Sequence, residues 1–379
     1  MEKLRGLSLF ANVGIAEAFF ESLGINIKIA NELVPDRAKF YQDVYPQTHM
    51  VCGDITDDQI RNEIVNEAIA KNVDFIIATP PCQGMSEAGL RLEFDERNQL
   101  VWYAIDVIKK VKPRFALLEN VPKQLTTKIR LGEKTMLIPE YIKHELEPFY
   151  NFNKETLIMA KDHGVPQLRE RNIFLLVRKD QPIVWEFPEK ENEITLRDAI
   201  GNLPSLDPLL REGLDETIKH FPEFEKKKAD AAKISKWHYP PTHSWKQVEW
   251  MMHTPTGKSA IYNEVYYPQK TDGTPVKAHH NHYRRLKWDM PCRTVTQNNG
   301  VISSLACVHP GHPYRENGKT LYSDPRVLTI YELLIVMSLP LDWPIPDWAN
   351  ETFIRKVFGE GIPSKLVMKI MKVLLNQLK

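Results

Sequence analysis

Short apolar runs alternate with amphipathic segments along the first half of the chain. The apolar runs have the length and continuous hydrophobicity of buried β-strands, and they occupy residues 6–10, 25–30, 50–52, 73–78 and 114–118. The segments between them repeat apolar side chains at helical spacing, at residues 16–23, 35–45, 60–72 and 100–112. This alternation predicts an α/β fold, with a mostly parallel sheet covered by helices on both faces.

The alternation continues to about residue 185. A helix is expected at residues 141–148, and strands at 150–159 and 172–177. Prolines, charges and aromatic residues dominate afterwards, which predicts irregular and short β structure. A last apolar-periodic helix, at residues 363–378, has a proline near its start.

These changes in pattern predict three parts. Residues 1–185 form the main domain, and residues 186–346 form a smaller, irregular, β-containing domain. Residues 347–379 return to complete the main domain, which is then discontinuous along the chain.

Composition narrows the class of protein. No stretch of the 379 residues approaches the length of a membrane span, and the charged N-terminus leads into no signal-peptide pattern. The four cysteines are few and far apart, which is typical of a reducing cytoplasm and not of a disulfide framework. We therefore expect a cytoplasmic protein without a membrane partner.

Charge is unevenly distributed, although the net charge is only +1. Residues 186–225 hold 11 acidic and 4 basic side chains, whereas residues 226–293 hold 13 basic and 5 acidic ones, a local net charge of +8. Tryptophans and tyrosines are interleaved in the basic stretch. This mixture is typical of a nucleic-acid surface, and the alternative is a solvated face beside buried aromatic residues.

A cysteine follows one of the expected strands. The run at residues 73–78 leads into Thr79-Pro80-Pro81-Cys82-Gln83-Gly84, where two prolines end the strand and stiffen the exit. Since α/β folds bind ligands at the carboxyl ends of their strands, Cys82 is a candidate nucleophile. The alternative is a small, buried hydrophobic residue.

A carboxylate and a cationic strip are expected at the same edge. Glu119 ends an apolar run, where partial desolvation would favour its protonated form and a general-acid role. Alternation along an extended chain places Gln167, Arg169 and Arg171 on one face, which suits a carbonyl oxygen or a phosphate. The alternatives are a surface glutamate and a half-exposed edge strand.

Three other strand ends suit a nucleoside-bearing cofactor. The turn at residues 10–17 would expose main-chain N–H groups, but with Gly14 as its one glycine it equally fits an ordinary turn. Glu32 ends the second strand, where an acid can bind ribose hydroxyls. Asp54 follows the third strand and either accepts a hydrogen bond from an adenine amine or caps the next helix.

Taken in order, these motifs resemble those of the prokaryotic DNA (cytosine-5) methyltransferases of restriction-modification systems. The family's Pro-Cys-Gln, Glu-Asn-Val and Gln-x-Arg-x-Arg motifs are similar to residues 81–83, 119–121 and 167–171. Its other motifs resemble residues 10–14, 53–55, 326–332 and 359–363. The match covers residues 6–185 and 284–379.

The resemblance implies a Rossmann-like sheet that uses S-adenosyl-L-methionine, with the smaller domain as a target-recognition domain for double-stranded DNA. Cys82 would add to C6 of a flipped-out cytosine, while Glu119 binds N3 and the exocyclic amine and supplies a proton. Arg169 and Arg171 would stabilise the charge that develops on O2. C5 would then take the methyl group and lose its proton as Cys82 leaves, giving 5-methylcytosine.

The resemblance also implies binding residues and partners. The positions matching the family's cofactor pocket are Phe10, Val13, Gly14, Glu32, Leu33, Asp54, Ile55, Pro81 and Leu100. The positions matching residues that support catalysis or close the recognition region around DNA are Gln83, Ser86, Gln167, Thr294, Thr296 and Gly300. A monomer working alongside a cognate restriction endonuclease is expected.

Three positions depart from the family pattern. Asn12 and Ile15 stand where the family usually has glycines, and Glu360 stands where it usually has asparagine. All three belong to the cofactor region, so they bear on cofactor contacts, whereas the catalytic motifs are intact.

Other classes fit less of the sequence. A transfer-RNA cytosine-5 methyltransferase would share the catalytic residues, but the Cys-Phe-Thr usual in such relatives is absent. An inactive DNA-binding regulator would not need the intact catalytic motifs. A thiol hydrolase would need a histidine oriented on Cys82, and the strand-end motifs contain none.

A metal site is not expected. His279, His280 and His282 lie near Cys292 and Cys307 in the sequence, but their spacing fits no common zinc pattern.

Overall fold

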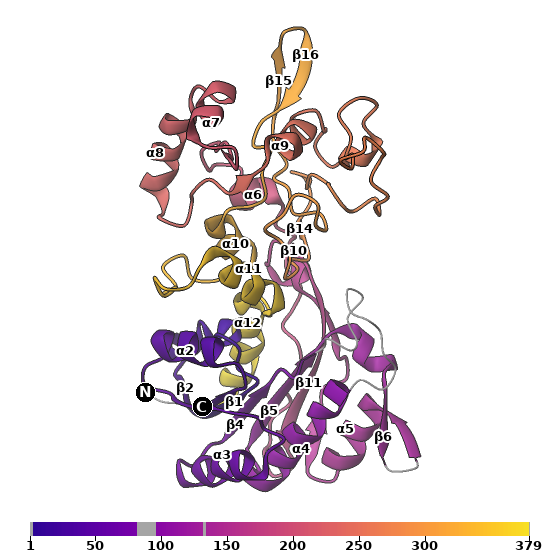
Figure 1. The fold of residues 1–379 in the computed structure, drawn as a ribbon. Coiled ribbons are helices and arrows are strands. Elements are labelled where there is room, and N and C mark those ends of the chain that lie inside the picture. The colour runs from indigo at the N-terminus through magenta and orange to yellow at the C-terminus, as the bar shows by residue number, and fades with distance from the viewer. Residues whose placement is uncertain (1–2, 82–95, 132–133, 379) are drawn as a thin grey trace.

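A large sheet forms the base of the molecule in the computed structural model, which describes residues 3–81, 96–131 and 134–378 (Figure 1). Its strand order is β3-β2-β1-β4-β5-β11-β8, with β9 paired to β11. The parallel strands are β1 (Leu4–Leu9), β2 (Ile25–Glu32), β3 (His49–Cys52), β4 (Phe75–Ala78) and β5 (Phe115–Asn120). Antiparallel pairing joins β11 (Glu170–Arg178) to β5, β8 (Tyr150–Phe152) and β9 (Leu157–Met159). The predicted Rossmann-like, mostly parallel sheet is confirmed.

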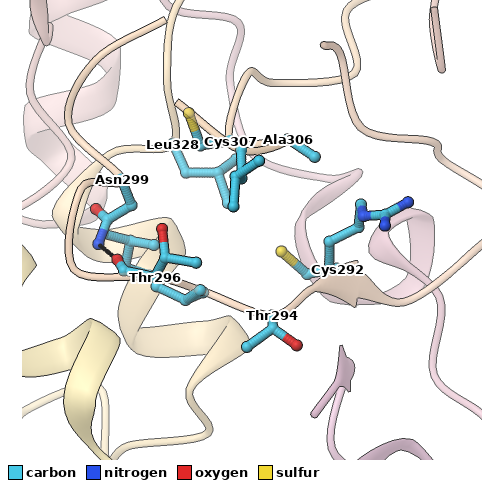
Figure 2. Close-up of a pocket in the computed structure, with 11 residues that line it drawn as sticks. Cys292, Thr294, Thr296, Asn299, Ala306, Cys307 and Leu328 are labelled. Carbon is cyan, nitrogen blue, oxygen red and sulfur yellow. Dashed lines mark hydrogen bonds between the residues drawn. The ribbon is translucent and has the colours of Figure 1, made fainter. Parts of the chain in front are cut away.

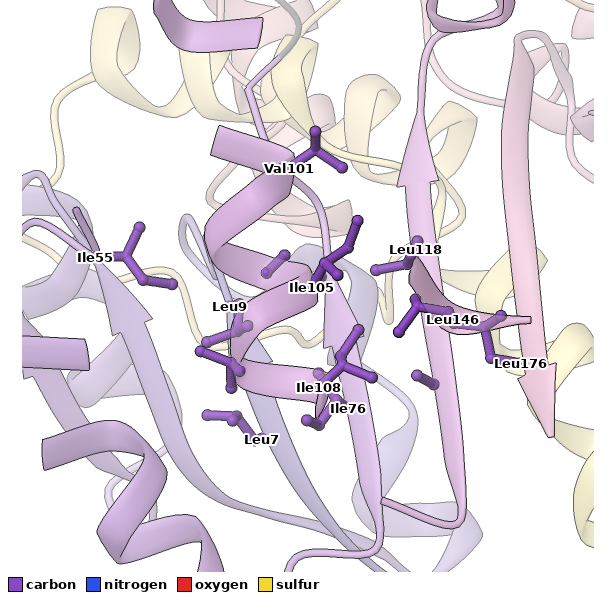
Figure 3. Close-up of a cluster of buried hydrophobic side chains, with 14 of the residues drawn as sticks. Leu7, Leu9, Ile55, Ile76, Val101, Ile105, Ile108, Leu118, Leu146 and Leu176 are labelled. Carbon is purple, nitrogen blue, oxygen red and sulfur yellow. The ribbon is translucent and has the colours of Figure 1, made fainter. Parts of the chain in front are cut away.

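Both faces of this sheet are buried, which explains why its strands are continuous apolar runs. Ala116 and Leu118 of β5 pack toward α3 (Asp58–Ala70), α4 (Leu100–Val111) and α5 (Ile138–Leu146), as Figure 3 shows for this cluster. Phe115 and Leu117 pack on the opposite face, in a cluster with α1 (Phe20–Leu23), Tyr41 of α2 (Pro35–Val44) and α12 (Ser364–Leu375). The C-terminal helix therefore covers a sheet built from the N-terminal half.

Two sequence predictions in this part were wrong in detail. The helix predicted at residues 16–23 is a short 3₁₀ turn, η1 (Ile15–Glu17), followed by α1. The single strand predicted at residues 150–159 is divided into β8 and β9. The division falls at Asn153, whose N–H still donates to the Leu175 carbonyl (3.2 Å) while its side chain accepts from the Leu175 N–H (2.8 Å) and donates to the Ile173 carbonyl (3.0 Å).

The upper part of the molecule in Figure 1 combines helices with short strand pairs. The strand pairs are β10 (Gln167–Leu168) with β14 (Cys292–Arg293), β12 (Leu209–Leu210) with β13 (Thr242–His243), and the protruding hairpin β15 (Pro313–Glu316) with β16 (Lys319–Tyr322). The helices are α6 (Leu196–Ile200), α7 (Leu214–His220), α8 (Phe224–Ile234), α9 (Trp245–Met252) and α10 (Ile330–Val336). The short β structure was predicted and the helices were not. In α8, for example, only Phe224 and Ala231 are buried, so a helical apolar pattern is weak.

A third apolar cluster joins the two parts. It contains Val13 and Ile15 after β1, Phe40 of α2, and Leu334 and Phe358 of α10 and α11 (Glu351–Glu360). The remaining short elements are η2 (Glu96–Gln99), η3 (Pro122–Thr126), β6 (Lys128–Leu131), β7 (Lys134–Leu137), η4 (Ala160–His163) and η5 (Ala260–Tyr262). Among the described residues, none of the helices has both the length and the apolar character that a membrane crossing needs.

Candidate active site

The segment that leads to Cys82 is fixed by the neighbouring strands. The Asn120 side chain at the end of β5 donates to the Pro80 carbonyl (3.1 Å) and accepts from the Val121 N–H (2.8 Å). On the other side, the Thr79 hydroxyl donates to the Phe10 carbonyl (3.1 Å). The strand exit is thus held between β1 and β5 up to Pro81. Cys82 itself, with Gln83 and Ser86, lies outside the described residues.

An ion pair stands next to this exit. Glu119 of β5 and Arg171 of β11 contact each other at 2.6 Å between Oε1 and Nε, and their side chains are only 11% and 9% exposed. The antiparallel pairing of the two strands produces this contact, with Ile173 opposite Glu119. A carboxylate and a guanidinium are therefore presented together at the carboxyl edge of the sheet, beside Asn120.

Gln167 and Arg169 contact a different part of the chain from Arg171. The Arg169 guanidinium is buried and donates to the main-chain carbonyls of Val295 (2.9 Å) and Gly359 (3.0 Å). Gln167 accepts from the Val295 N–H (3.2 Å). The predicted shared face requires an extended chain, but here the Gln167 N–H bonds to the Val165 carbonyl and the Arg169 N–H to the Gln167 carbonyl, so the chain turns tightly before β11.

The segment around Thr294 lies against this turn. β10 and β14 pair in parallel, and the Thr294 hydroxyl donates to the Leu168 carbonyl. Thr296 lies in the same segment, and its carbonyl accepts from the Asn299 side chain (2.7 Å). Gly300 lies against Arg355, because a Cβ added there would meet the Arg355 Cδ at 2.8 Å. Of the predicted recognition-region residues, Thr294 therefore lies directly against the Gln-x-Arg-x-Arg motif, whereas Thr296 and Gly300 contact Asn299 and Arg355.

The two cysteines considered for zinc line a small pocket with Thr294 and Thr296 (Figure 2). Burial raises the pKa of both thiols, that of Cys307 to about 12. Cys292 and Cys307 are therefore held as neutral thiols at physiological pH. No group of three or more His, Cys, Asp or Glu side chains in the described ranges is arranged to hold a metal ion.

The loop at residues 10–14, which is predicted to bind the cofactor and is called the cofactor loop below, has an unusual backbone. Phe10 (φ 58°), Asn12 (φ 49°) and Gly14 (φ 78°) all adopt left-handed conformations, so the chain reverses tightly between β1 and η1. Glu32 at the end of β2 accepts hydrogen bonds from the Asn12 N–H (2.9 Å) and the Val34 N–H (3.0 Å). The loop and the predicted ribose-binding acid are thus directly connected.

The other predicted cofactor residues surround this edge with different degrees of exposure. Leu33 is 59% exposed and offers apolar surface to a ligand. Phe10, Pro81 and Leu100 are half-buried, whereas Val13 and Ile55 are packed in the core. Asp54 is exposed and accepts from the Thr56 N–H (2.9 Å). The N-cap of α3 is Asp57, so the helix-capping role considered for Asp54 is filled by the aspartate three positions later.

This edge fits a nucleoside that carries an amino acid tail. The Asn12 Oδ1 atom is buried without a hydrogen-bond partner, and a donor group on a ligand would satisfy it. Glu32 and the exposed Asp54 offer carboxylate oxygens, and Leu33 and Phe10 offer apolar surface. The residues present are therefore compatible with S-adenosyl-L-methionine.

Two groups behind the site were missed by the sequence prediction. Glu17 in η1 is buried and accepts hydrogen bonds from the Ser8 and Tyr41 hydroxyls, and burial raises the pKa of its carboxyl to about 7. Asn120 holds Pro80, as described above. A glutamate within an apolar helical stretch is a weak signal for Glu17, and only membership of the Glu-Asn-Val motif points to Asn120.

Fold and site together define a Rossmann-like methyltransferase with a second, irregular domain. The model of the C-5 cytosine-specific DNA methylase family matches residues 4–376, and the chain belongs to this family.

Individual relatives agree with this assignment. The chain is 41% identical over 381 residues to the Type II methyltransferase M1.HgaI of Avibacterium volantium, covering 99% of both chains. It is 34% identical over 206 residues to the Type II methyltransferase M.NgoPII of Neisseria gonorrhoeae, covering 52% of this chain and 56% of that one. The solved structure of the Entamoeba histolytica methyltransferase EhMeth superposes with a TM-score of 0.61 at 14% identity, over 100% of both chains, and supports the fold.

Proposed function

We propose that this DNA cytosine-5 methyltransferase acts on a flipped-out cytosine in a specific duplex sequence, through a covalent bond between Cys82 and C6. The observation that carries the proposal is the Glu119–Arg171 pair, which stands beside the Asn120-held exit that leads to Cys82. A carboxylate and a guanidinium can bind the polar edge of a base, and the adjoining strand exit can bring a thiolate to the ring. Because its relatives are named Type II methyltransferases, we further propose that the enzyme belongs to a restriction-modification system and works alongside a cognate endonuclease.

The side chains divide the work on the cytosine ring. S-adenosyl-L-methionine, when bound, would supply an electrophilic methyl group to C5 and would leave as S-adenosylhomocysteine. The Cys82 thiolate adds to C6, and the electron pair of the C5–C6 double bond makes C5 nucleophilic. Glu119 binds N3 and the exocyclic amine and supplies a proton to N3 as charge builds there. The C5 proton then passes to a solvent base, its bonding electrons re-form the C5–C6 double bond as the Cys82 thiolate leaves, and N3 returns its proton to Glu119.

The two arginines have different proposed roles. Arg171, in contact with Glu119, is the guanidinium that we propose binds O2 and stabilises its developing charge. The guanidinium of Arg169 is engaged by the Val295 and Gly359 carbonyls, so we propose that it supports the site by holding these segments together. Gln167 supports the same junction through Val295.

We propose residues 186–346 as the target-recognition domain and residues 347–379 as the segment that completes the catalytic domain. The local net charge of +8 over residues 226–293 supports contact with the DNA backbone. Thr294 connects this domain to the Gln-x-Arg-x-Arg motif, and we propose that Thr296, Gly300, Gln83 and Ser86 support DNA binding or catalysis. Because stacked cytosine is inaccessible to a side chain at a sheet edge, the base must leave the duplex.

The cofactor is proposed to lie along the ends of β1, β2 and β3. Glu32 is the acid for the ribose hydroxyls and Asp54 the acceptor for the adenine amine. Phe10 and Leu33 would cover the adenine ring, and Leu100 and Pro81 would border it from α4 and the exit after β4.

Methyl transfer tests the proposal directly. The protein is incubated with methyl-labelled S-adenosyl-L-methionine and either duplex DNA or transfer RNA, together with Cys82→Ala and Glu119→Gln. Label is expected in duplex DNA alone, with none for Cys82→Ala and a reduction of roughly 10²–10⁴-fold for Glu119→Gln. Label only in transfer RNA, or full labelling by Cys82→Ala, would overturn the proposal.

A further inference from the structure

The residues that depart from the family pattern contact one another. Asn12 in the cofactor loop and Glu360 at the end of α11 are 348 positions apart in sequence, yet the Asn12 Nδ2 donates to the Glu360 Oε2 at 2.9 Å. Ile15 meets the residue that follows Glu360, since a Cβ added to Gly361 would lie 2.8 Å from the Ile15 Cδ1. Asn12, one of the departures on the loop, therefore binds the departure on the C-terminal segment, and Ile15 packs against the next residue.

An arginine completes this contact. The Arg37 Nη2 in α2 lies 2.8 Å from both carboxylate oxygens of Glu360, and the two side chains are 16% and 13% exposed. The main chain of Glu360 is held as well, because Arg169 donates to its carbonyl at 3.3 Å. Glu360 thus has a fixed main chain and a carboxylate shared between Arg37 and Asn12. Hydrogen bonds with a charged partner of this kind are stronger than neutral ones.

The contact continues to the acid of the proposed cofactor site. The Asn12 side chain binds Glu360, while the Asn12 N–H donates to the Glu32 Oε2 at 2.9 Å. One residue therefore links the C-terminal carboxylate to the acid proposed for the ribose. Asn12 has a φ of 49°, a left-handed conformation that glycine and asparagine both adopt, but only asparagine adds a side chain that reaches Glu360.

We propose that Arg37, Glu360 and Asn12 form a clasp that positions the loop at residues 10–14 and Glu32 for cofactor binding. Arg37 and Glu360 are positioning residues that act through Asn12, the loop backbone and Glu32, whereas Asn12 also offers its unpaired Oδ1 atom to the cofactor. In this chain an asparagine and a glutamate replace the glycine and asparagine of the family pattern as a pair, each needed by the other. The inference rests on the proposed cofactor site and extends it to α11, which closes that site from the far end of the chain.

A double-mutant cycle tests the clasp. The variants are Asn12→Gly, Glu360→Asn and the two combined, and S-adenosylhomocysteine binding is measured by calorimetry on the full chain. Each single variant is expected to weaken binding by about tenfold or more, because Asn12→Gly releases the loop from Glu360 and removes the Oδ1 atom, and Glu360→Asn leaves Arg37 without its carboxylate. The combined variant is expected to bind no more weakly than Asn12→Gly alone, since both substitutions break the same contact.

Kinetics and a matched control separate positioning from general destabilisation. The KM for S-adenosyl-L-methionine is expected to rise about tenfold in each single variant, with kcat within about twofold. Glu191→Gln removes another ion pair that reaches the C-terminal segment, to Lys369 of α12, away from the loop, and is expected to leave binding unchanged.

Three results would overturn the clasp: unchanged binding in the single variants, losses that multiply in the combined variant, or equal weakening by Glu191→Gln. The binding readout does not depend on Cys82. Weakened binding in the single variants, in a protein that binds S-adenosylhomocysteine but transfers no methyl group, would therefore refute the proposed function and leave the clasp supported.

Discussion

Replacing Glu17 by glutamine should make the protein more stable at alkaline pH. Glu17 lies in η1, directly behind the cofactor loop, and its carboxylate accepts hydrogen bonds from Ser8 and Tyr41. Burial is the main reason that the pKa of this carboxyl is raised from 4.5 to about 7, and the two hydrogen bonds oppose it only in part. A buried carboxylate without a cation beside it is costly once it ionises.

The direction in which stability changes with pH follows from the pKa of Glu17 in the folded and unfolded states. The folded state holds the Glu17 proton more tightly than the unfolded chain, so this contribution to stability is complete below pH 4.5 and is lost as the pH rises through 7. At about 1.4 kcal/mol for each pH unit between the two pKa values, the loss amounts to about 3 kcal/mol by pH 8.5. Glu17→Gln cannot ionise and does not suffer this loss.

Urea unfolding, followed by tryptophan fluorescence at pH 5 and pH 8.5, measures the effect. The free energy of unfolding of Glu17→Gln, relative to the unsubstituted protein, should rise by about 2–3 kcal/mol between the two pH values. Glu21→Gln, at an exposed position in the neighbouring α1, is the control and should leave the pH profile unchanged. Parallel profiles for Glu17→Gln and the unsubstituted protein would refute the reasoning.

Three further substitutions test the role of Asn120 and the difference between buried and exposed ion pairs. Asn120→Ala removes the donor that holds the Pro80 carbonyl, so kcat should fall about 10–100-fold while the KM for S-adenosyl-L-methionine changes little; an unchanged kcat would contradict the role of Asn120. Arg326→Met leaves two buried carboxylates, one of them Glu332, without their cation, and should lower the free energy of unfolding by about 3–5 kcal/mol in urea. Arg178→Met breaks a pair with an exposed aspartate and should cost less than about 1 kcal/mol, and an equal loss in both variants would contradict the distinction.

Local patterns were enough to predict the strand ends that carry the chemistry. Continuous apolar runs predicted β4 and β5. Thr79 follows the first run and Glu119 follows the second, so both residues were expected at one edge of the sheet. A parallel sheet brings its carboxyl ends together, so their proximity followed from the fold class alone.

Contacts between distant segments could not be predicted from those patterns. The alternation rule put Arg169 and Arg171 on one face, but a tight turn before β11 directs them to different partners, Val295 and Glu119. The pairing of Asn12 with Glu360 depends on how α11 packs against the loop after β1, and hydrophobic periodicity holds no information about that packing. Both residues were recognised from the sequence as departures, without any sign that they meet.

The central claim is that Cys82 forms a covalent bond with the target cytosine, and trapping that bond tests it most directly. Duplex DNA in which 5-fluorocytosine replaces every cytosine is incubated with the protein and S-adenosyl-L-methionine, and then resolved on a denaturing gel. In 5-fluorocytosine, C5 carries fluorine in place of the proton whose loss releases Cys82. We therefore predict a stable protein–DNA adduct that Cys82→Ala does not form. Methyl transfer to ordinary duplex without any adduct on the fluorinated duplex, or an adduct that persists in Cys82→Ala, would contradict it.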